Sequence, residues 1–373
     1  MSKIDDLIQE LCPDGISVWS LGDLEDSGKI KLGRGMVISK NDIADNPGSY
    51  PVYSSSATGL GEFGRYSKYI FDDERITWSV DGGGRFFHRK AHKYSVTNVS
   101  GWIKVNDTNI ITKYLYYVLD NLWLTKKFDY VKKAHPSVIR NEYNIPLPPL
   151  EVQKEIVRVL DSFTELEAEL EAELEARKKQ YKYYRNDLLI FSKSSNTVEQ
   201  KLLSEVVRIK NGKDWKVAGE GNIPVYGSGG RMSMRVDRCM YNKPTVLLPR
   251  KGTISNVFYV EEPFWNVDTI YYTEIDADVI IPKYFFYFMD NFNLSKLDTG
   301  SGRPSLTHAV LNKIRIPIPP MSRQKQIVSI LDKFEKLTSD ISVGLPAEIE
   351  ARRKQYEYYR NKLLTFKELE HSK

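Results

Sequence analysis

Apolar residues fall at steps of three and four along two long stretches of the chain. In the first stretch they are Val152, Ile156, Val159, Phe163, Leu166, Leu170, Leu174, Tyr181, Tyr184 and Leu188. This spacing predicts one long helix whose apolar side forms a coiled-coil seam. Prolines at 146, 148 and 149 place its beginning after them, because proline disrupts a helix interior. About 40 residues at ~1.5 Å each give a rod of about 60 Å.

The second stretch begins after Pro320 and keeps the same spacing. Its apolar positions are Ile327, Ile330, Phe334, Leu337 and Ile341. It differs from the first stretch at Gly344-Leu345-Pro346, where the chain carries residues that end or bend a helix. We expect a break or sharp kink there, after which the helix resumes to about Phe366.

The two stretches are copies of each other. Residues 175–191 read EARKKQYKYYRNDLLIF and residues 350–366 read EARRKQYEYYRNKLLTF, with 13 of 17 positions identical. A second matched pair, IPLPPLEVQKEIVRVLDSF from Ile145 and IPIPPMSRQKQIVSILDKF from Ile316, lies upstream. Copies this similar indicate a duplicated architecture. If the two helices pair antiparallel, one globular domain stands at each end of a two-helix spacer, with an approximate two-fold axis between them.

The segments outside the helical copies read as mixed α and β structure. A short amphipathic helix is expected before Pro13-Asp14-Gly15, and another helix over 112–124. Strand-like runs occur at 69–71, 76–78 and 96–105, separated by turn residues at 46–48, 54–56 and 81–84. The fold class is therefore α+β: two β-rich domains, at 1–144 and 196–315, alternate with two helical spacers, at 145–195 and 316–373. Residues 192–197 form a polar linker.

The second globular segment repeats the plan of the first with other residues. Residues 50–54 correspond to 223–227, and residues 112–117 correspond to 282–287. His135-Pro136-Ser137 is matched in the same way with Arg303-Pro304-Ser305. The globular segments are far less alike than the helices.

Composition narrows the class of protein. Two cysteines among 373 residues, Cys12 and Cys239, supply neither a disulfide framework nor a four-cysteine zinc site. The beginning of the chain is too polar for a signal peptide, and no apolar run approaches the ~18 residues of a membrane span. A reduced cytoplasmic protein without a membrane partner is the simplest interpretation. The net charge of +5 permits a nucleic-acid partner without requiring one.

The doubled blocks, IP(L/I)PP with QK(E/Q)IV and EAR(K/R)KQY with YYRN, closely resemble the specificity subunit of type I restriction-modification systems, over essentially the whole chain. The resemblance implies two target-recognition domains, each reading one half of a bipartite double-stranded DNA site. It implies that two methyltransferase subunits bind the repeated helices and methylate adenine with S-adenosylmethionine. It also implies restriction subunits that use ATP and Mg for motor and nuclease activity. No cofactor is expected in this chain itself.

Base reading and phosphate binding need donors and cations that project from loops. The candidates for DNA binding are Arg65, Arg85, His88, Arg89, Lys93, Lys132, Lys133 and His135 in the first domain and Lys213, Arg231, Arg235, Arg250, Lys251 and Arg303 in the second. Glycines 82–84 would allow close approach to a phosphate. Any one of these residues, taken singly, is also explained as a solvated surface charge.

The tyrosines of the repeated helices divide by their register. Tyr181, Tyr184, Tyr356 and Tyr359 are expected to pack in the seam, whereas Tyr183 and Tyr358 lie off it and are expected to meet the partner. The candidate residues for partner binding are Arg177, Tyr183, Arg185, Arg352, Tyr358 and Arg360. The glutamates of the LEAE repeat at 166–176 read as the solvated side of a helix.

Enzyme motifs do not emerge from the sequence. His88 and His92 are four residues apart without an adjacent acidic or cysteine ligand, and Gly227-Ser228-Gly229-Gly230 lacks the lysine of a phosphate-binding loop. Asn144-Ile145-Pro146 is a poor match to an adenine-methyltransferase motif. We therefore expect a non-catalytic subunit. Two alternatives remain: a coiled-coil scaffold that joins two proteins without touching DNA, and a self-contained enzyme with a degenerate active site.

Overall fold

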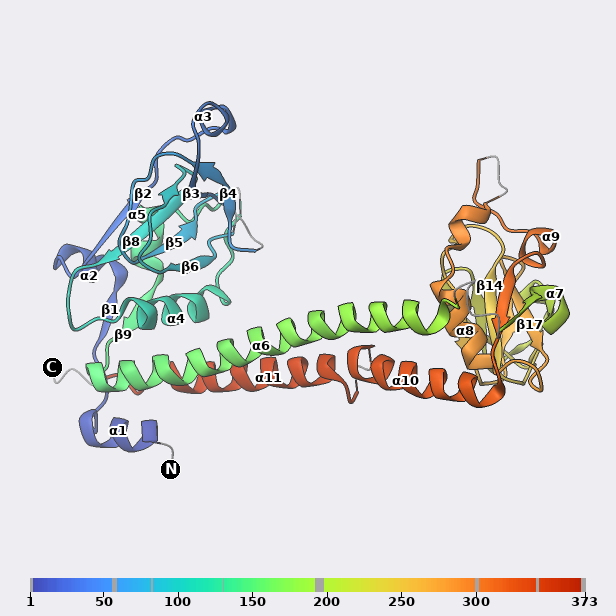
Figure 1. Cartoon of the computed structure of the whole chain (residues 1–373). Helices are drawn as coiled ribbons and strands as arrows, with labels where there is room; N and C mark the ends of the chain where they lie inside the picture. The colour runs from blue at the N-terminus through green and yellow to red at the C-terminus, as the bar shows by residue number, and fades with distance from the viewer. Residues whose placement is uncertain are drawn as a thin grey trace. The chain divides into compact units, whose positions relative to one another are not determined.

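The computed structural model describes residues 3–55, 59–81, 83–129, 131–191, 198–298, 302–339 and 342–369. The chain divides into two compact units (Figure 1). Unit 1 comprises Met1–Glu169 with Glu350–Lys373, and unit 2 comprises Leu170–Ile349. Unit 1 thus joins segments from distant parts of the sequence. The segment boundaries expected at residues 144, 195 and 315 follow the alternation of globular and helical sequence and stay predictions.

Unit 1 contains a globular domain of three small sheets with strand orders β2-β8-β5-β6, β4-β3-β7 and β1-β9. Its helices are α1 (Lys3–Leu11), α2 (Leu21–Asp26), α3 (Lys40–Asp45), α4 (Thr112–Trp123) and α5 (Pro136–Glu142), and its strands are β1 (Val18–Ser20), β2 (Ile30–Arg34), β3 (Pro47–Tyr53), β4 (Glu62–Tyr66), β5 (Arg75–Ser79), β6 (Phe86–Arg89), β7 (Ser95–Val96), β8 (Ser100–Val105) and β9 (Asn144–Pro146). Strand β3 pairs antiparallel with β4 and parallel with β7.

Unit 2 has the same topology, with strand orders β11-β17-β14-β15, β13-β12-β16 and β10-β18. Its helical elements are α7 (Leu203–Val206), η1 (Trp215–Val217), α8 (Pro282–Asn291), η2 (Leu294–Leu297) and α9 (His308–Leu311), and its strands are β10 (Glu199–Leu202), β11 (Val207–Asn211), β12 (Glu220–Gly227), β13 (Gly230–Val236), β14 (Thr245–Pro249), β15 (Phe258–Val260), β16 (Trp265–Asn266), β17 (Ile270–Ile275) and β18 (Arg315–Ile318). The duplicated α+β architecture predicted from the helical copies is therefore confirmed.

The long helices follow the predicted pattern. Helix α6 runs from Leu150 to Leu189 as 40 continuous residues. The second copy is divided into α10 (Met321–Ser339) and α11 (Leu345–Leu363), which confirms the break predicted near Gly344-Leu345-Pro346. Gly344 directly precedes α11, and Pro346 is the second residue of that helix, in the first turn, where proline is tolerated.

Each unit holds an antiparallel pair of helix segments. In unit 1, Phe163 of α6 stacks on Tyr359 of α11 with ring centroids 5.4 Å apart. Four residues further along α6, Glu167 pairs with Arg353, six residues earlier on α11. In unit 2, Tyr184 of α6 stacks in the same way on Phe334 of α10 at 5.7 Å. In both units, a phenylalanine of one helical copy thus stacks on a tyrosine of the other copy.

The core of each globular domain lies between its sheet and its longest domain helix. In unit 1, α4 places Tyr114 and Leu115 against buried Trp78 and Phe86 of the sheet. Residues Val152, Ile156 and Leu160 of α6 belong to the same cluster, so α4 lies between the sheet and α6 (Figure 1). Helix α8 has the same position in unit 2, where its neighbours include Ile327 and Leu331 of α10.

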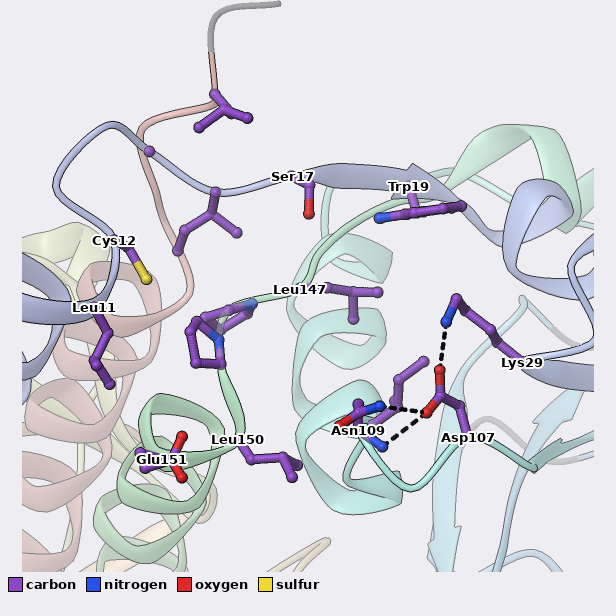
Figure 2. A pocket seen from close by; sticks show the side chains of 16 residues that line it. Leu11, Cys12, Ser17, Trp19, Lys29, Asp107, Asn109, Leu147, Leu150 and Glu151 are labelled. Atoms are coloured by element: carbon purple, nitrogen blue, oxygen red, sulfur yellow. Dashed lines mark hydrogen bonds and ion pairs between the residues drawn. The ribbon is translucent and has the colours of Figure 1, made fainter.

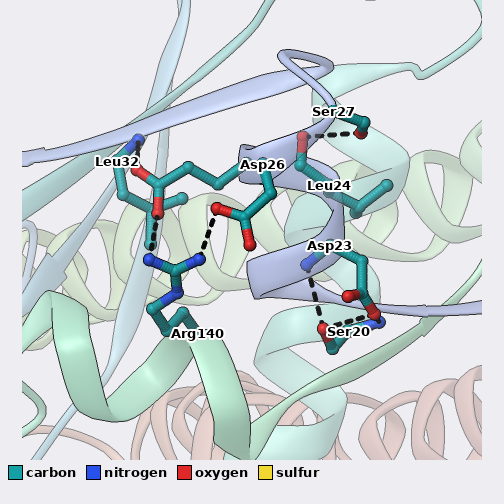
Figure 3. A network of polar contacts seen from close by, with 8 residues as sticks. Ser20, Asp23, Leu24, Asp26, Ser27, Leu32 and Arg140 are labelled. Atoms are coloured by element: carbon teal, nitrogen blue, oxygen red, sulfur yellow. Dashed lines mark hydrogen bonds and ion pairs between the residues drawn. The ribbon is translucent and has the colours of Figure 1, made fainter.

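Helix α2 begins with a reciprocal cap (Figure 3). The Ser20 hydroxyl accepts from the Asp23 backbone N–H, and the Asp23 carboxylate accepts from Ser20 N–H. Arg140 of α5 donates to Asp26 at 2.6 Å and lies near Glu25, whose carboxylate also accepts from Leu32 N–H. This polar network attaches α2 to α5 and β2.

Some local predictions were wrong. Residues 69–71 do not form a strand: Ile70 lies in a bend, and Phe71 makes one isolated bridge to Tyr94. Pro47 begins strand β3 instead of a turn. His135 is the N-cap of α5, and the equivalent cap of α9 is Thr307, so His135 does not correspond to Arg303. The linker 192–197, Ser56, Gly82 and Ile341, on which predictions were made, lie outside the described residues.

Candidate nucleic-acid interface

A buried glutamine joins each globular domain to the helix that follows it. The Gln153 amide donates to the carbonyl oxygens of Asn109 (2.9 Å) and Pro148 (2.8 Å), while its oxygen accepts from Ile111 N–H. Ile111 is the N-cap residue of α4, so Gln153 satisfies a backbone donor at the beginning of that helix.

Gln324 makes the equivalent three bonds in unit 2. It donates to the carbonyl oxygens of Val279 and Pro319, both at 3.0 Å, and accepts from Ile281 N–H at 2.8 Å. Both glutamines are 1% exposed. The repeated PP and QK motifs therefore encode the attachment of a domain to its helix.

Buried tyrosines add a second attachment. Tyr117 of α4 donates to Asp161 of α6 at 2.5 Å, and Lys113 pairs with the same carboxylate. In unit 2, Tyr287 of α8 donates to Asp332 and Glu335 of α10. Burial raises the pKa of both tyrosines, and the neighbouring carboxylates raise it further. Both therefore stay protonated donors at neutral pH.

Two loops of unit 2 bring three predicted DNA contacts together. Gly252 N–H donates to the Pro304 carbonyl at 3.1 Å, and Leu306 N–H donates to the Arg250 carbonyl at 2.8 Å. A bridge between Lys251 and Ser305 continues this pairing. Arg250, Lys251 and Arg303, separated by about fifty residues in sequence, therefore lie on one pair of adjoining loops, which we call the two-loop cluster. The Lys251 side chain is 54% exposed.

Glycines give the two-loop cluster an open backbone. Gly252 and Gly302 have φ angles of +83° and +125°, which side-chain-bearing residues rarely adopt. A Cβ at Gly302 would meet nothing within 4 Å. The Arg250 guanidinium lies 5.8 Å from the Tyr271 ring and donates to the Asp268 carbonyl. An anion could approach both the cations and the backbone of these loops.

The remaining candidates of unit 2 lie on the surface apart from this loop pairing. Arg231 and Arg235 are exposed on β13, where Arg231 pairs with Glu262 at 3.3 Å and Arg235 donates to the Asn222 carbonyl. Lys213 is exposed just after β11.

In unit 1, Lys93 is an exposed candidate that lies beside aromatic rings. Its ammonium lies 4.9 Å from the Tyr69 ring and 5.7 Å from the Tyr50 ring, and the two rings meet edge to face. Tyr69 is 42% exposed. Arg65 is exposed on the neighbouring β4 and pairs with Glu62 at 2.9 Å. Aromatic faces beside cations suit nucleic-acid contacts. Tyr50 and Tyr69 were not among the residues predicted to contact DNA.

Arg89 differs from the sequence prediction because it is buried. It is 5% exposed, donates to Thr77 Oγ1 (3.0 Å) and the Leu60 carbonyl (2.8 Å), and its guanidinium lies 3.6 Å from the Tyr53 ring. Burial lowers the pKa of Arg89 to about 10. These contacts favour a structural role over the predicted DNA contact.

Other candidates of unit 1 are engaged within the domain. His88 lies 2.6 Å from Glu74, and burial lowers the pKa of His88 despite that carboxylate. Lys132 pairs with Glu142 at 3.0 Å and Lys133 with Asp81 at 3.1 Å, although both lysines are exposed. Burial raises the pKa of the half-buried Asp120, and the charges of Arg360 and Arg85 oppose that rise. His135 accepts from Ser137 N–H as a helix cap.

The candidates for partner binding fall into two groups. Tyr183 and Tyr358 are 66% and 63% exposed, and each meets its neighbouring tyrosine edge to face. Arg177 bonds to Glu173 and Gln180, and Arg352 bonds to Gln355, so these arginines lie along their own helices. Arg185 instead pairs with Asp290 of the globular domain in unit 2, and Arg360 is 8% exposed.

The tyrosines of the seam are less buried than the register predicts. Tyr181, Tyr356 and Tyr359 are half-buried, and Tyr184 is 39% exposed although it stacks on Phe334. Leu160, which the register omitted, is fully buried because it faces the globular domain as well as the helix pair.

Unit 1 also has an open hollow of about 650 Å³ beside the beginning of α6 (Figure 2). Trp19, Leu147 and Leu150 supply apolar walls. Lys29 and Asp107 lie in it as an ion pair at 2.5 Å, and Asp107 also accepts from Asn109. This hollow lacks the exposed cations of the two-loop cluster.

Within the described residues, no group of three or more His, Cys, Asp or Glu side chains could hold a metal ion. None of the helices described is long and apolar enough to cross a membrane.

Comparison with known proteins identifies the family. Residues 13–176 and 196–351 each match the type I restriction modification DNA specificity domain. The type I restriction enzyme EcoR124I/EcoR124II specificity subunit of Escherichia coli is 31% identical over 354 residues, covering 84% of each chain.

Two solved structures share the fold. The type I restriction-modification S subunit from M. genitalium gives a TM-score of 0.63 at 18% identity, covering 94% of this chain and 96% of that one. A chain from a structure on complex assembly and conformational transition of the type I R-M system gives 0.61 at 14% identity, covering 94% and 98%. The chain therefore belongs to the type I restriction-modification specificity subunit family, with the DNA specificity domain present twice.

Proposed function

We propose that the chain reads a bipartite, asymmetric site on double-stranded DNA, one half-site with each globular domain, and catalyses no reaction itself. The observation that carries this proposal is the two-loop cluster, where pairing of distant loops gathers Arg250, Lys251 and Arg303 beside an open glycine backbone. Cations of this kind bind phosphate and position a protein on DNA.

Two adenine methyltransferase subunits are proposed as partners, with S-adenosylmethionine bound to them and not to this chain. The duplicated helices offer two equivalent surfaces, on which Tyr183 and Tyr358 are exposed at matching positions. Restriction subunits that use ATP and Mg would join the same assembly. The similar Escherichia coli protein is named as the specificity subunit of a type I restriction enzyme, which supports an assembly with further subunits.

The decisive experiment is base-resolution mapping of adenine methylation in cells with and without this chain. The expected result is one methylated motif of two half-sites with a fixed gap, present only with the chain. If the chain were a scaffold that never touches DNA, no methylated motif would depend on its presence. The affinity of its complex with the methyltransferase for duplex DNA would then show no slope against log salt concentration.

The two-loop cluster gives a residue-level prediction. Replacing Lys251 and Arg303 by alanine should weaken DNA binding by the complex with the methyltransferase and reduce the log-salt slope by about 0.9 for each lost phosphate contact. The methylated sequence should be unchanged, because phosphate contacts carry no base information. Binding is measured by titration at several salt concentrations.

The matched control is Lys201→Ala on β10, which removes a cation from the same unit outside the loops. It should leave the slope unchanged. An unaltered slope in the Lys251→Ala/Arg303→Ala double variant would exclude the two-loop cluster from the DNA interface.

A further inference from the structure

Two arginines at matching positions of the repeated helical blocks, Arg185 and Arg360, each interact with an acidic residue of a globular domain. Arg185 of α6 pairs with Asp290 of α8 in unit 2. In unit 1, burial raises the pKa of Asp120 of α4 and the charge of Arg360 of α11 opposes that rise. Asp120 and Asp290 are equivalent, since each lies nine residues beyond the N-cap residue of its helix, Ile111 or Ile281. The duplication thus preserves both partners of the contact.

In unit 2 the contact is a short ion pair. Arg185 Nη1 lies 2.5 Å from Asp290 Oδ2, with the two side chains 20% and 35% exposed. The Arg185 guanidinium also lies 5.3 Å from the Tyr181 ring. Partial burial raises the pKa of Asp290, Arg185 opposes that rise, and Glu335 adds to it. The carboxylate therefore depends on Arg185 for its stabilisation.

In unit 1 the equivalent arginine, Arg360, is more buried than Arg185. Arg360 is 8% exposed, and its guanidinium lies 5.3 Å from the Tyr356 ring, as Arg185 does from Tyr181. Burial raises the pKa of Asp120, while the charges of Arg360 and Arg85 lower it. Removing Arg360 or Arg85 would leave the charged form of Asp120, in the domain helix α4, with less electrostatic stabilisation.

Each domain helix is consequently held by both members of the helix pair. The beginning of α4 is bound by Gln153 of α6, and Asp120, about 13 Å further along, is stabilised in its charged form by Arg360 of α11. The beginning of α8 is bound by Gln324 of α10, and Asp290 meets Arg185 of α6. The glutamine contact comes from the helix that directly follows the domain, whereas the arginine comes from the helix of the other half of the chain.

We propose that the Arg185–Asp290 ion pair is a positioning contact that fixes the orientation of its domain on the helix pair, and thereby the single gap length that the two half-sites must have, and that Arg360 and Asp120, at the equivalent positions, have the same role in unit 1. This inference rests on the proposed function. A shift of one helix by a turn, about 5.4 Å, would separate the arginine from its acid and leave the glutamine bonds intact. The arginine contact therefore links domain orientation to the register of the helices.

The test measures gap tolerance, which a purely structural role would not change. The complex of the full chain with its methyltransferase is assayed on DNA libraries that keep both half-sites and vary the gap by one or two base pairs. The variants are Asp290→Asn, Arg185→Lys and the charge exchange Arg185→Asp with Asp290→Arg. Lys182→Ala, an exposed cation of the same helix, is the matched control.

The single variants should raise methylation at gaps altered by one base pair at least tenfold relative to the original gap, with both half-sites unchanged. The charge exchange should restore the original preference, and Lys182→Ala should keep it. If Asp290→Asn, the most conservative variant, kept the original gap preference, the proposal would be overturned. It would also be overturned if all three variants lost half-site recognition without methylating DNA with altered gaps. If the unaltered complex methylates no bipartite site, the proposed function itself is wrong. That result is distinct from unchanged gap preference in the variants, which would contradict only the role of the arginine contact.

Discussion

Glu155 illustrates how a charged residue is accommodated beside the core of unit 1. Its side chain is 6% exposed, and it pairs with Arg158 at 2.7 Å and Lys3 of α1 at 3.1 Å. The Arg158 hydrogen bonds are the main cause that lowers the pKa of Glu155 to about 2, from an ordinary value of 4.5, and Lys3 adds to the effect. Since the folded pKa is depressed, the stabilisation exists above pH 4.5 and is lost as the pH falls toward 2.

We predict that Glu155→Gln lowers the free energy of unfolding by about 1–2 kcal/mol at pH 7, a value kept small because Lys3 and Arg158 are largely exposed and screened. The difference from the unaltered chain should shrink between pH 4.5 and 2. Urea unfolding at pH 7, 4 and 3 measures it. The exposed Glu151→Gln is the control, and a difference that stays constant with pH would contradict the assigned role.

Residue type alone did not distinguish surface cations from buried ones. Arg89 and Lys93 are four residues apart and were grouped as DNA contacts, yet Arg89 is buried beneath Tyr53 while Lys93 is exposed over Tyr50 and Tyr69. The difference depends on where neighbouring strands place their aromatic rings, which local sequence does not specify. Joint charge reversal of the two would therefore combine a core defect with a surface change.

At the scale of elements, the helix-to-domain attachment is the best-defined feature. Gln153 and Gln324 each satisfy one backbone donor and two backbone acceptors that are otherwise remote from solvent. Loss of such a partner leaves buried polar groups unsatisfied. The motif around them is repeated because both domains need the same attachment.

We predict that Gln153→Ala and Gln324→Ala each lower the free energy of unfolding by about 1–3 kcal/mol, through unit 1 and unit 2 respectively. Hydrogen exchange should show faster exchange at Ile111 N–H in the first variant and at Ile281 N–H in the second. Gln355→Ala, at an exposed position of α11, is the control. Equal exchange at both amides in all variants would disprove the assignment.

The helices were predictable because their signals are periodic and local. The spacing of apolar residues indicated α6, the Gly-Leu-Pro sequence indicated the break before α11, and 112–124 became α4. The short strands were less predictable: Phe71 makes one bridge, and Pro47 begins a strand that has a bulge. Such pairing depends on partners far away in sequence. The two-loop cluster and the contacts of Arg185 and Arg360 were unpredictable for the same reason.

At the scale of the whole molecule, the proposed gap length depends on the helices between the domains. Inserting one more Leu-Glu-Ala-Glu unit after Leu170 should add about 6 Å and lengthen the unread gap by about two base pairs, with both half-sites unchanged. The reason is that the insertion adds helix to the spacer and alters neither domain. Base-resolution methylation mapping provides the measurement.

A four-residue Gly-Gly-Ser-Gly insertion at the same place is the control, because it adds length without adding rigid helix. It should blur the gap instead of lengthening it by a defined amount. Altered half-sites with an unchanged gap after the Leu-Glu-Ala-Glu insertion would reject the role of the helices as a spacer.

The composition of unit 1 has a consequence for synthesis. Residues 350–369 complete it: Tyr359 stacks on Phe163, Arg360 acts on Asp120, and the segment after α11 bonds to Ile16 through Lys367 and Leu369. Unit 2 is one continuous segment. On the ribosome, where earlier domains usually fold first, the order is therefore reversed: the later-made unit can finish folding while the earlier-made one waits for its final helix, exposed meanwhile to chaperones and proteases.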